Sequence, residues 1–263
     1  MDTFADYILD EKDLSAKMEI TYYLAKKAKI FFDKSVIFKT ELARMFIDYM
    51  KIEVDRNTVL TACLLCNCKK IDNAQDIEKI HSYAKEGAEY LRGLGFSKRF
   101  SKICEEVNRY SGSNPRERES DILELVDQFG GMLLDRPERI GFKPDEALVL
   151  LEHRNLKDEY NRYLHTFKEF VGMLEDTTIQ DQTSIKTLRY LVKLYNEATN
   201  VKEFIKEVCY EFEPKIDKAI MKYNEHIEKG MFEKSNVPLF SEETTRKILS
   251  HIATENEEAS NLN

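Results

Sequence analysis

The sequence has no tryptophan, only 9 glycines and 5 prolines, and no run of about 18 apolar residues. So few breaking residues leave room for long, uninterrupted helices. The N-terminal residues show no basic stretch followed by an apolar core, which a secretory signal would require. We therefore expect a cytoplasmic protein without a membrane-spanning segment.

Positive charge is not in excess. The chain carries 40 lysines and arginines against 48 aspartates and glutamates, for a net charge of -8, and no basic block stands out. Non-specific binding to nucleic acids or anionic membranes depends on concentrated positive charge. We therefore predict that neither is a partner.

The cysteines do not form a disulfide framework. There are five, an odd number, and Cys63, Cys66 and Cys68 are crowded together, which is typical of a reducing compartment. This spacing could supply thiolates to zinc, with Cys104 or His81 as a fourth ligand, but it lacks the paired Cys-x-x-Cys repeats of structural zinc sites. We interpret these cysteines as packing in the core.

The residues that are present point to helices. Hydrophobic residues make up 42% of the chain and charged residues 33%, as in a folded protein with a charged surface. Apolar residues recur at helical spacing almost throughout, without a convincing alternating strand. Turn residues separate the helices, and Pro144 is placed to open one. The apolar stripes include Ile20, Leu24 and Ala28; Ile122, Leu125, Val126, Phe129 and Leu133; Ile185, Leu188, Leu191, Val192 and Tyr195; and Phe204, Ile205, Val208 and Phe212.

The predicted class is therefore all-α. We divide the chain into a helical domain over residues 1–156, a C-terminal helical region over 157–254 that ends with a short helix after a linker, and a disordered polar tail over 255–263. The C-terminal region is large enough to serve as a docking or dimerisation surface.

Two neighbouring segments carry a resemblance. Residues 126–132 read Val-Asp-Gln-Phe-Gly-Gly-Met, and residues 135–139 read Asp-Arg-Pro-Glu-Arg. In this order they resemble the Ala-Asp-x-Phe-Asp-Ala-Met and Asp-Arg-Pro-Tyr-Arg segments of the HD-GYP phosphodiesterases. Four further segments match that family's pattern in order: Leu-Leu-Cys-Asn-Cys-Lys-Lys at 64–70, Gly-Ala-Glu-Tyr-Leu at 87–91, Arg-Tyr-Ser-Gly-Ser-Asn-Pro at 109–115 and Pro-Asp-Glu-Ala-Leu at 144–148.

The resemblance implies an HD-domain-like helical bundle that, in the family, holds two or three irons and cuts cyclic di-GMP. Such chemistry needs several imidazole and carboxylate ligands, because the metals bind the phosphate and activate water. Here the His-Asp pair is replaced by Cys66 and Asn67, the next histidine by Tyr83, and two adjacent histidines fall near residues 106–107. Asp127 is the single recognisable ligand position that is kept.

We therefore predict a non-catalytic bacterial regulatory protein, related to cyclic di-GMP signalling, that binds a nucleotide or a partner protein on this scaffold. We assign ligand binding to Lys70, Tyr83, Tyr110 and Arg136, and the resemblance leaves Asp127 as a vestigial metal position. Tyr110 is included as an aromatic side chain that could stack on a nucleotide base. No cofactor is expected. Lys70 would contact phosphate in the family, although a surface lysine is the simpler interpretation.

Two alternatives remain open. The first is a metal-dependent phosphodiesterase with rearranged ligands, drawn from Asp127, His81, Glu106 and the cysteines. Glu105, Glu106 and Asp121 could also build a replacement carboxylate site, but charged residues along a helix usually form a solvated face, which is what we predict here. The second is scaffolding, in which the protein forms a dimer through its C-terminal helices.

Overall fold

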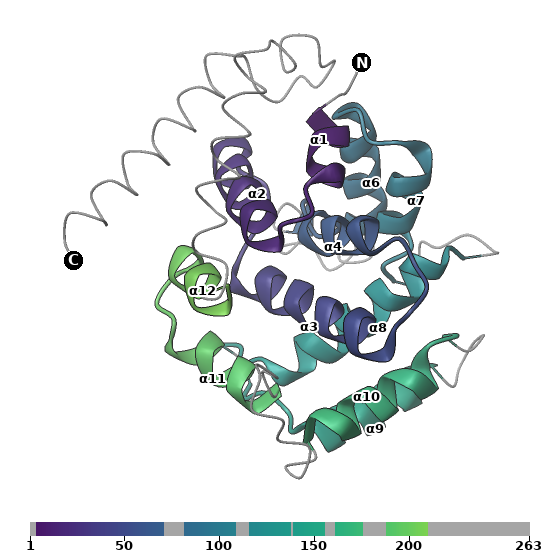
Figure 1. Ribbon diagram of the computed structural model, residues 1–263, viewed down its shortest axis with the longest axis vertical. Coiled ribbons are helices and arrows are strands. Elements are labelled where there is room, and N and C mark those ends of the chain that lie inside the picture. Colours follow the sequence, from purple (N-terminus) through teal and green to yellow (C-terminus); the bar gives the residue numbers. More distant parts are fainter. Residues whose placement is uncertain are drawn as a thin grey trace.

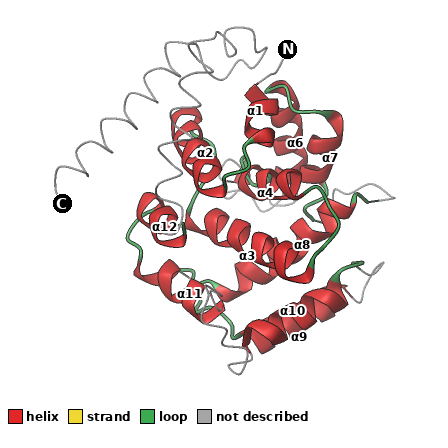
Figure 2. Cartoon of the chain, viewed as in Figure 1, coloured by secondary structure: helices red, strands yellow, loops and turns green. Residues whose placement is uncertain are grey.

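The computed structural model describes residues 4–70, 82–108, 116–137, 139–155, 161–175 and 188–209. Figure 2 shows that these residues form helices and connecting loops, and a single bridge between Arg136 and Arg139 is the one β contact among them. The all-α prediction is confirmed. The helices are α1 (Phe4–Asp10), α2 (Leu14–Ala28), α3 (Lys34–Met50), α4 (Arg56–Leu65), α6 (Tyr83–Gly93), α7 (Lys98–Glu105), α8 (Arg118–Leu133), α9 (Pro144–Asn155), α10 (Leu164–Glu175), α11 (Leu188–Glu197) and α12 (Val201–Val208).

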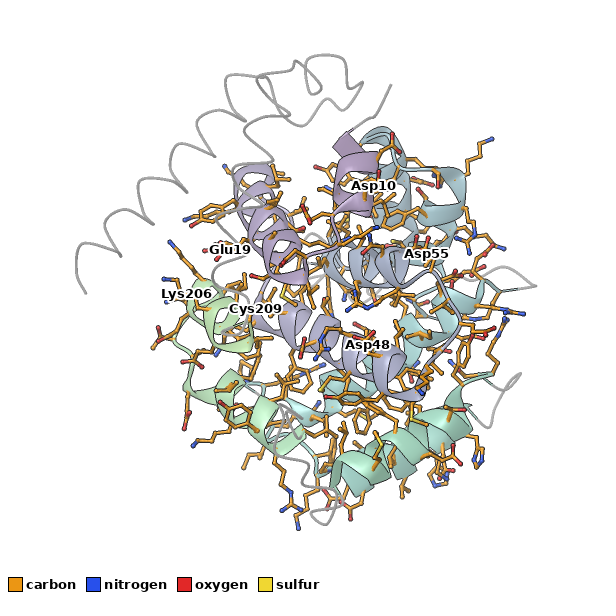
Figure 3. The ribbon with its side chains drawn as sticks, in the orientation of Figure 1. Asp10, Glu19, Asp48, Asp55, Lys206 and Cys209 are labelled. Atoms are coloured by element: carbon orange, nitrogen blue, oxygen red, sulfur yellow. The ribbon has the colours of Figure 1, made fainter. Side chains whose placement is uncertain are left out.

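Short polar side chains begin several of these helices. Asp13, Asp33 and Asp55 are the N-caps of α2, α3 and α4, and each accepts hydrogen bonds from backbone N–H groups of the first turn. Such caps satisfy donors that a helix leaves unpaired at its start. Asp55 is labelled in Figure 3. The start of α9 at Pro144 confirms the predicted role of that proline.

Helix α3 lies at the centre of the fold (Figure 1) and packs against α4, α8, α10, α11 and α12. Phe46 of α3 contacts Phe167 of α10, with ring centroids 5.0 Å apart, and Phe129 of α8 contacts the same ring at 5.2 Å. All three side chains are fully buried. The hydrophobic core thus continues from α3 and α8 into helices that follow residue 156.

Helices α11 and α12 are joined to the start of α3. The Lys34 ammonium group donates to the carbonyl oxygens of Tyr195 and Ala198, each at 2.6 Å, and lies 4.6 Å from the centre of the Tyr195 ring.

Three expectations stay predictions: the HD-domain-like arrangement, the division at residue 156 and a dimer through the C-terminal helices. Phe212, the expected last helix and the tail 255–263 lie outside the described residues.

All five cysteines are buried and none forms a disulfide. Burial raises the pKa of the Cys66 and Cys104 thiols well above the ordinary value, because the anionic thiolate is poorly solvated there. Cys209, at the end of α12 (Figure 3), lies against Met18 of α2. The cysteines therefore pack as small hydrophobic residues, as predicted.

None of the described helices is both long and apolar enough to cross a lipid bilayer.

A lysine of α2 is buried between α1 and α4. The Lys17 ammonium group donates to the carbonyl oxygen of Ile8 at 2.8 Å and to the Thr61 hydroxyl at 2.7 Å, and the residue is 1% exposed. Burial lowers the pKa of Lys17 to about 7, although the nearby carboxylates of Glu11 and Asp55 act in the opposite direction. The side chain therefore joins three helices at the cost of desolvating its charge.

The lowered pKa of Lys17 predicts how stability changes with pH. The unfolded chain keeps this lysine protonated up to its ordinary value of 10.5, so above pH 7 the unfolded state binds more protons than the folded state. Lys17 therefore contributes a rise in the free energy of unfolding of roughly 1 kcal/mol per pH unit between pH 7 and 8.5. The buried thiols oppose this rise in the same window, because in the unfolded chain they ionise with a pKa of about 8.5. The contribution of Lys17 is therefore the difference in slope from a chain that lacks this lysine.

Urea unfolding at pH 7.0, 7.5, 8.0 and 8.5 measures this slope directly. The Lys17→Met variant has no group that titrates at this position, and we expect a clearly smaller slope from it. Equal slopes in the two proteins would show that Lys17 is charged in the folded state at neutral pH.

Candidate anion-binding site

Asp127 is the centre of a polar cluster beside the core. It lies in the last two turns of α8, and its Oδ1 accepts a hydrogen bond from Lys39 Nζ of α3 at 2.7 Å and another from Asn67 Nδ2 at 3.0 Å. Lys39 is almost completely buried and Asp127 keeps a side-chain exposure of 18%. Asp127 is therefore held by an ion pair within the bundle and opens to the surface on one side.

Lys70 and Tyr83 lie next to this pair. Lys70 follows the turn after α4, is partly buried, and places its Nζ 5.9 Å from the ring centre of Phe31 and 5.8 Å from that of Tyr83. Burial lowers the pKa of Lys70, and the charges of Lys39 and Arg136 lower it further while Asp127 raises it. Lys70 is therefore near all three charged members of the cluster.

Arg136 comes to the cluster from the loop after α8. Its guanidinium group donates to the Gly131 carbonyl oxygen at 3.3 Å, and the same oxygen accepts a shorter bond of 2.7 Å from Arg139. A Cβ atom on Gly131 would lie 3.1 Å from Arg136 Nη2 and 3.8 Å from Lys39 Nζ. The missing side chain at position 131 thus leaves space that the two cations share.

The cluster has a clear electrostatic character. Burial opposes ionisation of Asp127, but Lys39 and Lys70, together with the hydrogen bonds from Lys39 and Asn67, outweigh it and hold the pKa of this carboxyl well below its usual range. Burial and the Asp127 charge raise the pKa of Tyr83, so its phenol stays neutral. Two lysines therefore act on one carboxylate, and Arg136 lies near both lysines.

The loop that carries Arg136 is fixed by its own contacts. The backbones of Arg136 and Arg139 exchange two hydrogen bonds, and Phe142 N donates to the carbonyl oxygen of Met132 at 2.9 Å. Gly141 N donates to Asp135 Oδ1 at 2.7 Å, and a Cβ atom on this glycine would lie 2.0 Å from the Leu133 carbonyl oxygen. Glycine is therefore required where the loop crosses the end of α8.

The residues of the cluster do not fit a divalent metal centre. Such a centre needs several converging carboxylate, imidazole or thiolate ligands, but among the described residues no group of three or more histidine, cysteine, aspartate or glutamate side chains is placed to hold a metal. Asp127 is already paired with an ammonium group, and the Cys66 thiol stays protonated. Asn67 Oδ1 is a buried acceptor without a partner, but it is a single neutral oxygen.

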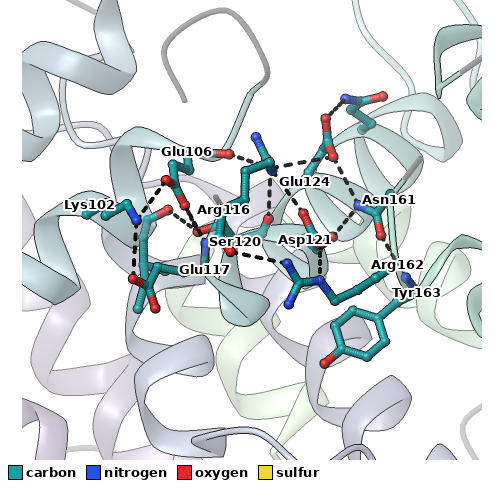
Figure 4. A network of polar contacts seen from close by, with 12 residues as sticks. Lys102, Glu106, Arg116, Glu117, Ser120, Asp121, Glu124, Asn161, Arg162 and Tyr163 are labelled. Atoms are coloured by element: carbon teal, nitrogen blue, oxygen red, sulfur yellow. Dashed lines mark hydrogen bonds and ion pairs between the residues drawn. The ribbon is translucent and has the colours of Figure 1, made fainter. Parts of the chain in front are cut away.

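A second polar network, in Figure 4, corrects one of our predictions. We expected Glu106 and Asp121 to lie on a solvated face, but both side chains are buried. Glu106 accepts hydrogen bonds from the Ser120 hydroxyl at 2.7 Å and from the backbone N–H of Glu117 at 2.9 Å. The Lys102 ammonium group of α7, 3.6 Å from Glu106, balances this buried charge.

Asp121 pairs with Arg116 at 2.9 Å and with Arg162, 41 residues further along the chain, at 2.6 Å. Asn161 donates to the backbone oxygen of Asp121 at 2.7 Å and to Glu124 at 3.0 Å. The network joins α8 to the start of α10 (Figure 4), and its carboxylates are occupied by these cations and amides. They do not form the replacement metal site that we had considered.

The sequence-predicted site residues fall into two groups. Lys70 and Tyr83 lie near Asp127 and Arg136 lies near Lys70, whereas Tyr110 lies outside the described residues, as does His81. Sequence reasoning missed Lys39. Its position was a usable signal, because it falls on the apolar stripe of α3 between Val36 and Ala43, where a lysine must find a partner.

We compared the chain with known proteins. No protein-family model, no curated protein and no solved structure matches it significantly. The resemblance to HD-GYP domains therefore rests on the sequence segments described above and stays a prediction.

Proposed function

We propose that this protein is a non-catalytic regulator that binds a phosphate-bearing ligand at the cluster of Asp127, Lys39, Lys70 and Arg136. One observation carries the proposal. Cations from three different parts of the chain, Lys39, Lys70 and Arg136, lie near one another, and among the described residues Asp127 forms an ion pair with Lys39 alone. Cationic side chains grouped in this way, with arginine among them, bind phosphate oxygens well.

The position of the cluster also supports the proposal. In the family that the sequence resembles, Asp127 and Lys70 would face metal ions and the phosphate of the substrate. Here Lys39 supplies positive charge beside Asp127, so a phosphate group could be bound without a metal. Because a metal-activated water is then missing, we propose binding without hydrolysis. A nucleotide is one such ligand. We also keep three proposals from the sequence: binding of a partner protein, a cytoplasmic location and a role in bacteria.

The test is a binding measurement with inorganic phosphate and pyrophosphate on the purified full chain. Calorimetry should detect binding, and Lys70→Ala and Arg136→Ala should each weaken it about tenfold or more, the effect of one lost charge-assisted hydrogen bond. Lys206→Ala is a matched control, because this exposed lysine lies on α12 at the outer edge of the molecule (Figure 3). It should bind like the wild type.

The metal-dependent alternative is tested on the same protein. Titration with Mn²⁺ alone should give no stoichiometric binding, and the protein should not hydrolyse bis(p-nitrophenyl) phosphate in its presence. Stoichiometric Mn²⁺ binding with turnover that Asp127→Ala abolishes would establish the alternative and overturn our proposal.

A further inference from the structure

The charges of the cluster define how much negative charge a ligand should bring. Lys39 and Asp127 are 2.7 Å apart and neutralise each other, which leaves the two positive charges of Lys70 and Arg136. No described residue forms an ion pair with either of these two side chains. Arg136 Nη2 and Lys39 Nζ both lie within 4 Å of the position that a Cβ atom on Gly131 would take, and the Arg136 charge acts on Lys70. One dianionic group between Lys70 and Arg136 would therefore neutralise both charges.

Arg136 is free to turn toward such a group. Its 3.3 Å hydrogen bond to the Gly131 oxygen is long, and Arg139 satisfies the same oxygen at 2.7 Å. Movement of the exposed Arg136 guanidinium would therefore leave no carbonyl unpaired. The planar guanidinium can then donate two parallel hydrogen bonds to two oxygens of one phosphate group.

The surroundings of Lys70 suggest where the rest of the ligand lies. The ring centres of Phe31 and Tyr83 lie 5.9 and 5.8 Å from Lys70 Nζ, so both rings provide apolar surface beside the Lys70 charge. Tyr83 stays neutral and its hydroxyl is hydrogen-bonded to the Asn108 side chain, so it adds no negative charge that would repel an anion. An organic group attached to the phosphate could pack against these rings.

We propose that the cluster selects phosphate monoesters, which carry two negative charges, over phosphate diesters, which carry one for each phosphate. This inference rests on the proposed function and adds the class of ligand. A diester would leave one of the two cations without a counter-charge, and its second ester group would replace an oxygen that Arg136 or Lys70 needs.

The test compares phenyl phosphate with methyl phenyl phosphate, two probes that share the aromatic ring and differ by one methyl ester and one charge. Calorimetry on the full chain at pH 7.5 should show about tenfold tighter binding of the monoester. Lys70→Ala and Arg136→Ala should each remove most of this preference, whereas Lys206→Ala should keep it.

Lowering the pH gives a second readout. The second pKa of a phosphate monoester is about 6, so at pH 5.0 only about a tenth of phenyl phosphate is dianionic. Because the monoanion should bind about tenfold more weakly, the apparent affinity should fall about fivefold. Inorganic sulfate stays dianionic at both pH values and reports any titration of the protein itself. The charged and titratable groups that face Lys70 are Lys39 of α3, Cys66 after α4, Tyr83 of α6, Asp127 of α8 and Arg136 of the following loop, and we expect unchanged sulfate binding.

The outcomes separate this inference from the function on which it rests. Equal binding of the two esters, weakened by both variants, would overturn the monoester preference and leave anion binding intact. An equal loss of phenyl phosphate and sulfate binding at pH 5.0 would likewise overturn it. Absence of binding by both esters and by inorganic phosphate would overturn the proposed function as well.

Discussion

Replacing Asp127 by alanine is expected to lower the free energy of unfolding by about 3 kcal/mol. The variant leaves the buried Lys39 ammonium group without its carboxylate, and it also removes the negative charge that acts on Lys70. Loss of one partner of a largely buried ion pair is costly because the remaining charge stays poorly solvated. Urea unfolding at pH 7 measures the change.

The double variant Asp127→Ala with Lys39→Met shows whether the ion pair is the cause. Removing both charges should recover part of the lost stability, so the two substitutions should be strongly non-additive in a double-mutant cycle. A neutral surface change alters the free energy of unfolding by about 0.5 kcal/mol or less. If Asp127→Ala changes it by no more than this, Lys39 has access to water and the cluster is more open than its contacts indicate.

Replacing Gly141 by alanine should be similarly damaging, by about 3 kcal/mol. The added Cβ atom would lie 2.0 Å from the carbonyl oxygen of Leu133 and 2.6 Å from its carbonyl carbon. Both are backbone atoms, so no side-chain rotation relieves the overlap and the loop must move away from α8. Because Arg136 is held in this loop, the variant should also weaken phosphate binding, which calorimetry detects alongside the unfolding measurement.

Gly172→Ala is the matched control. Gly172 lies within α10 and an added Cβ atom would meet nothing within 4 Å. Alanine favours the helix over glycine, so this variant should be more stable than the wild type by about 1 kcal/mol. Two glycine-to-alanine changes of opposite sign would show that the contact with Leu133 decides the effect. A Gly141→Ala protein as stable as the wild type would mean that the loop adopts a different path.

Local patterns in the sequence were sufficient for the helices. The apolar stripe from Ile122 to Leu133 became the buried face of α8, and the proline at position 144 began α9, because helical periodicity and start signals depend on neighbours in the chain. The stripe that we extended to Phe212 ends, in the described residues, with α12 at Val208.

The polar interior could not be predicted in the same way. Asp121 and Glu106 read as surface residues because Arg162, which pairs with Asp121, and Ser120, which donates to Glu106, lie on other segments. Periodicity within one helix does not reveal such partners. Lys39 and Asp127 are 88 residues apart for the same reason. The family resemblance supplied some of this missing information, since it grouped Lys70 and Arg136 with Asp127, whereas it gave no indication of Lys39.

The buried cysteines have a practical consequence. Thiol reagents attack the thiolate, and burial both shields these sulfurs and keeps them protonated. Folded chains should therefore react slowly, and each sulfur should become reactive only when the part of the fold that covers it opens. Cys63 and Cys66 would report on the interior beside Asp127, and Cys209 on the packing of α12 against α2. The chain thus carries its own intrinsic probes of local opening, which a ligand bound at the cluster should slow.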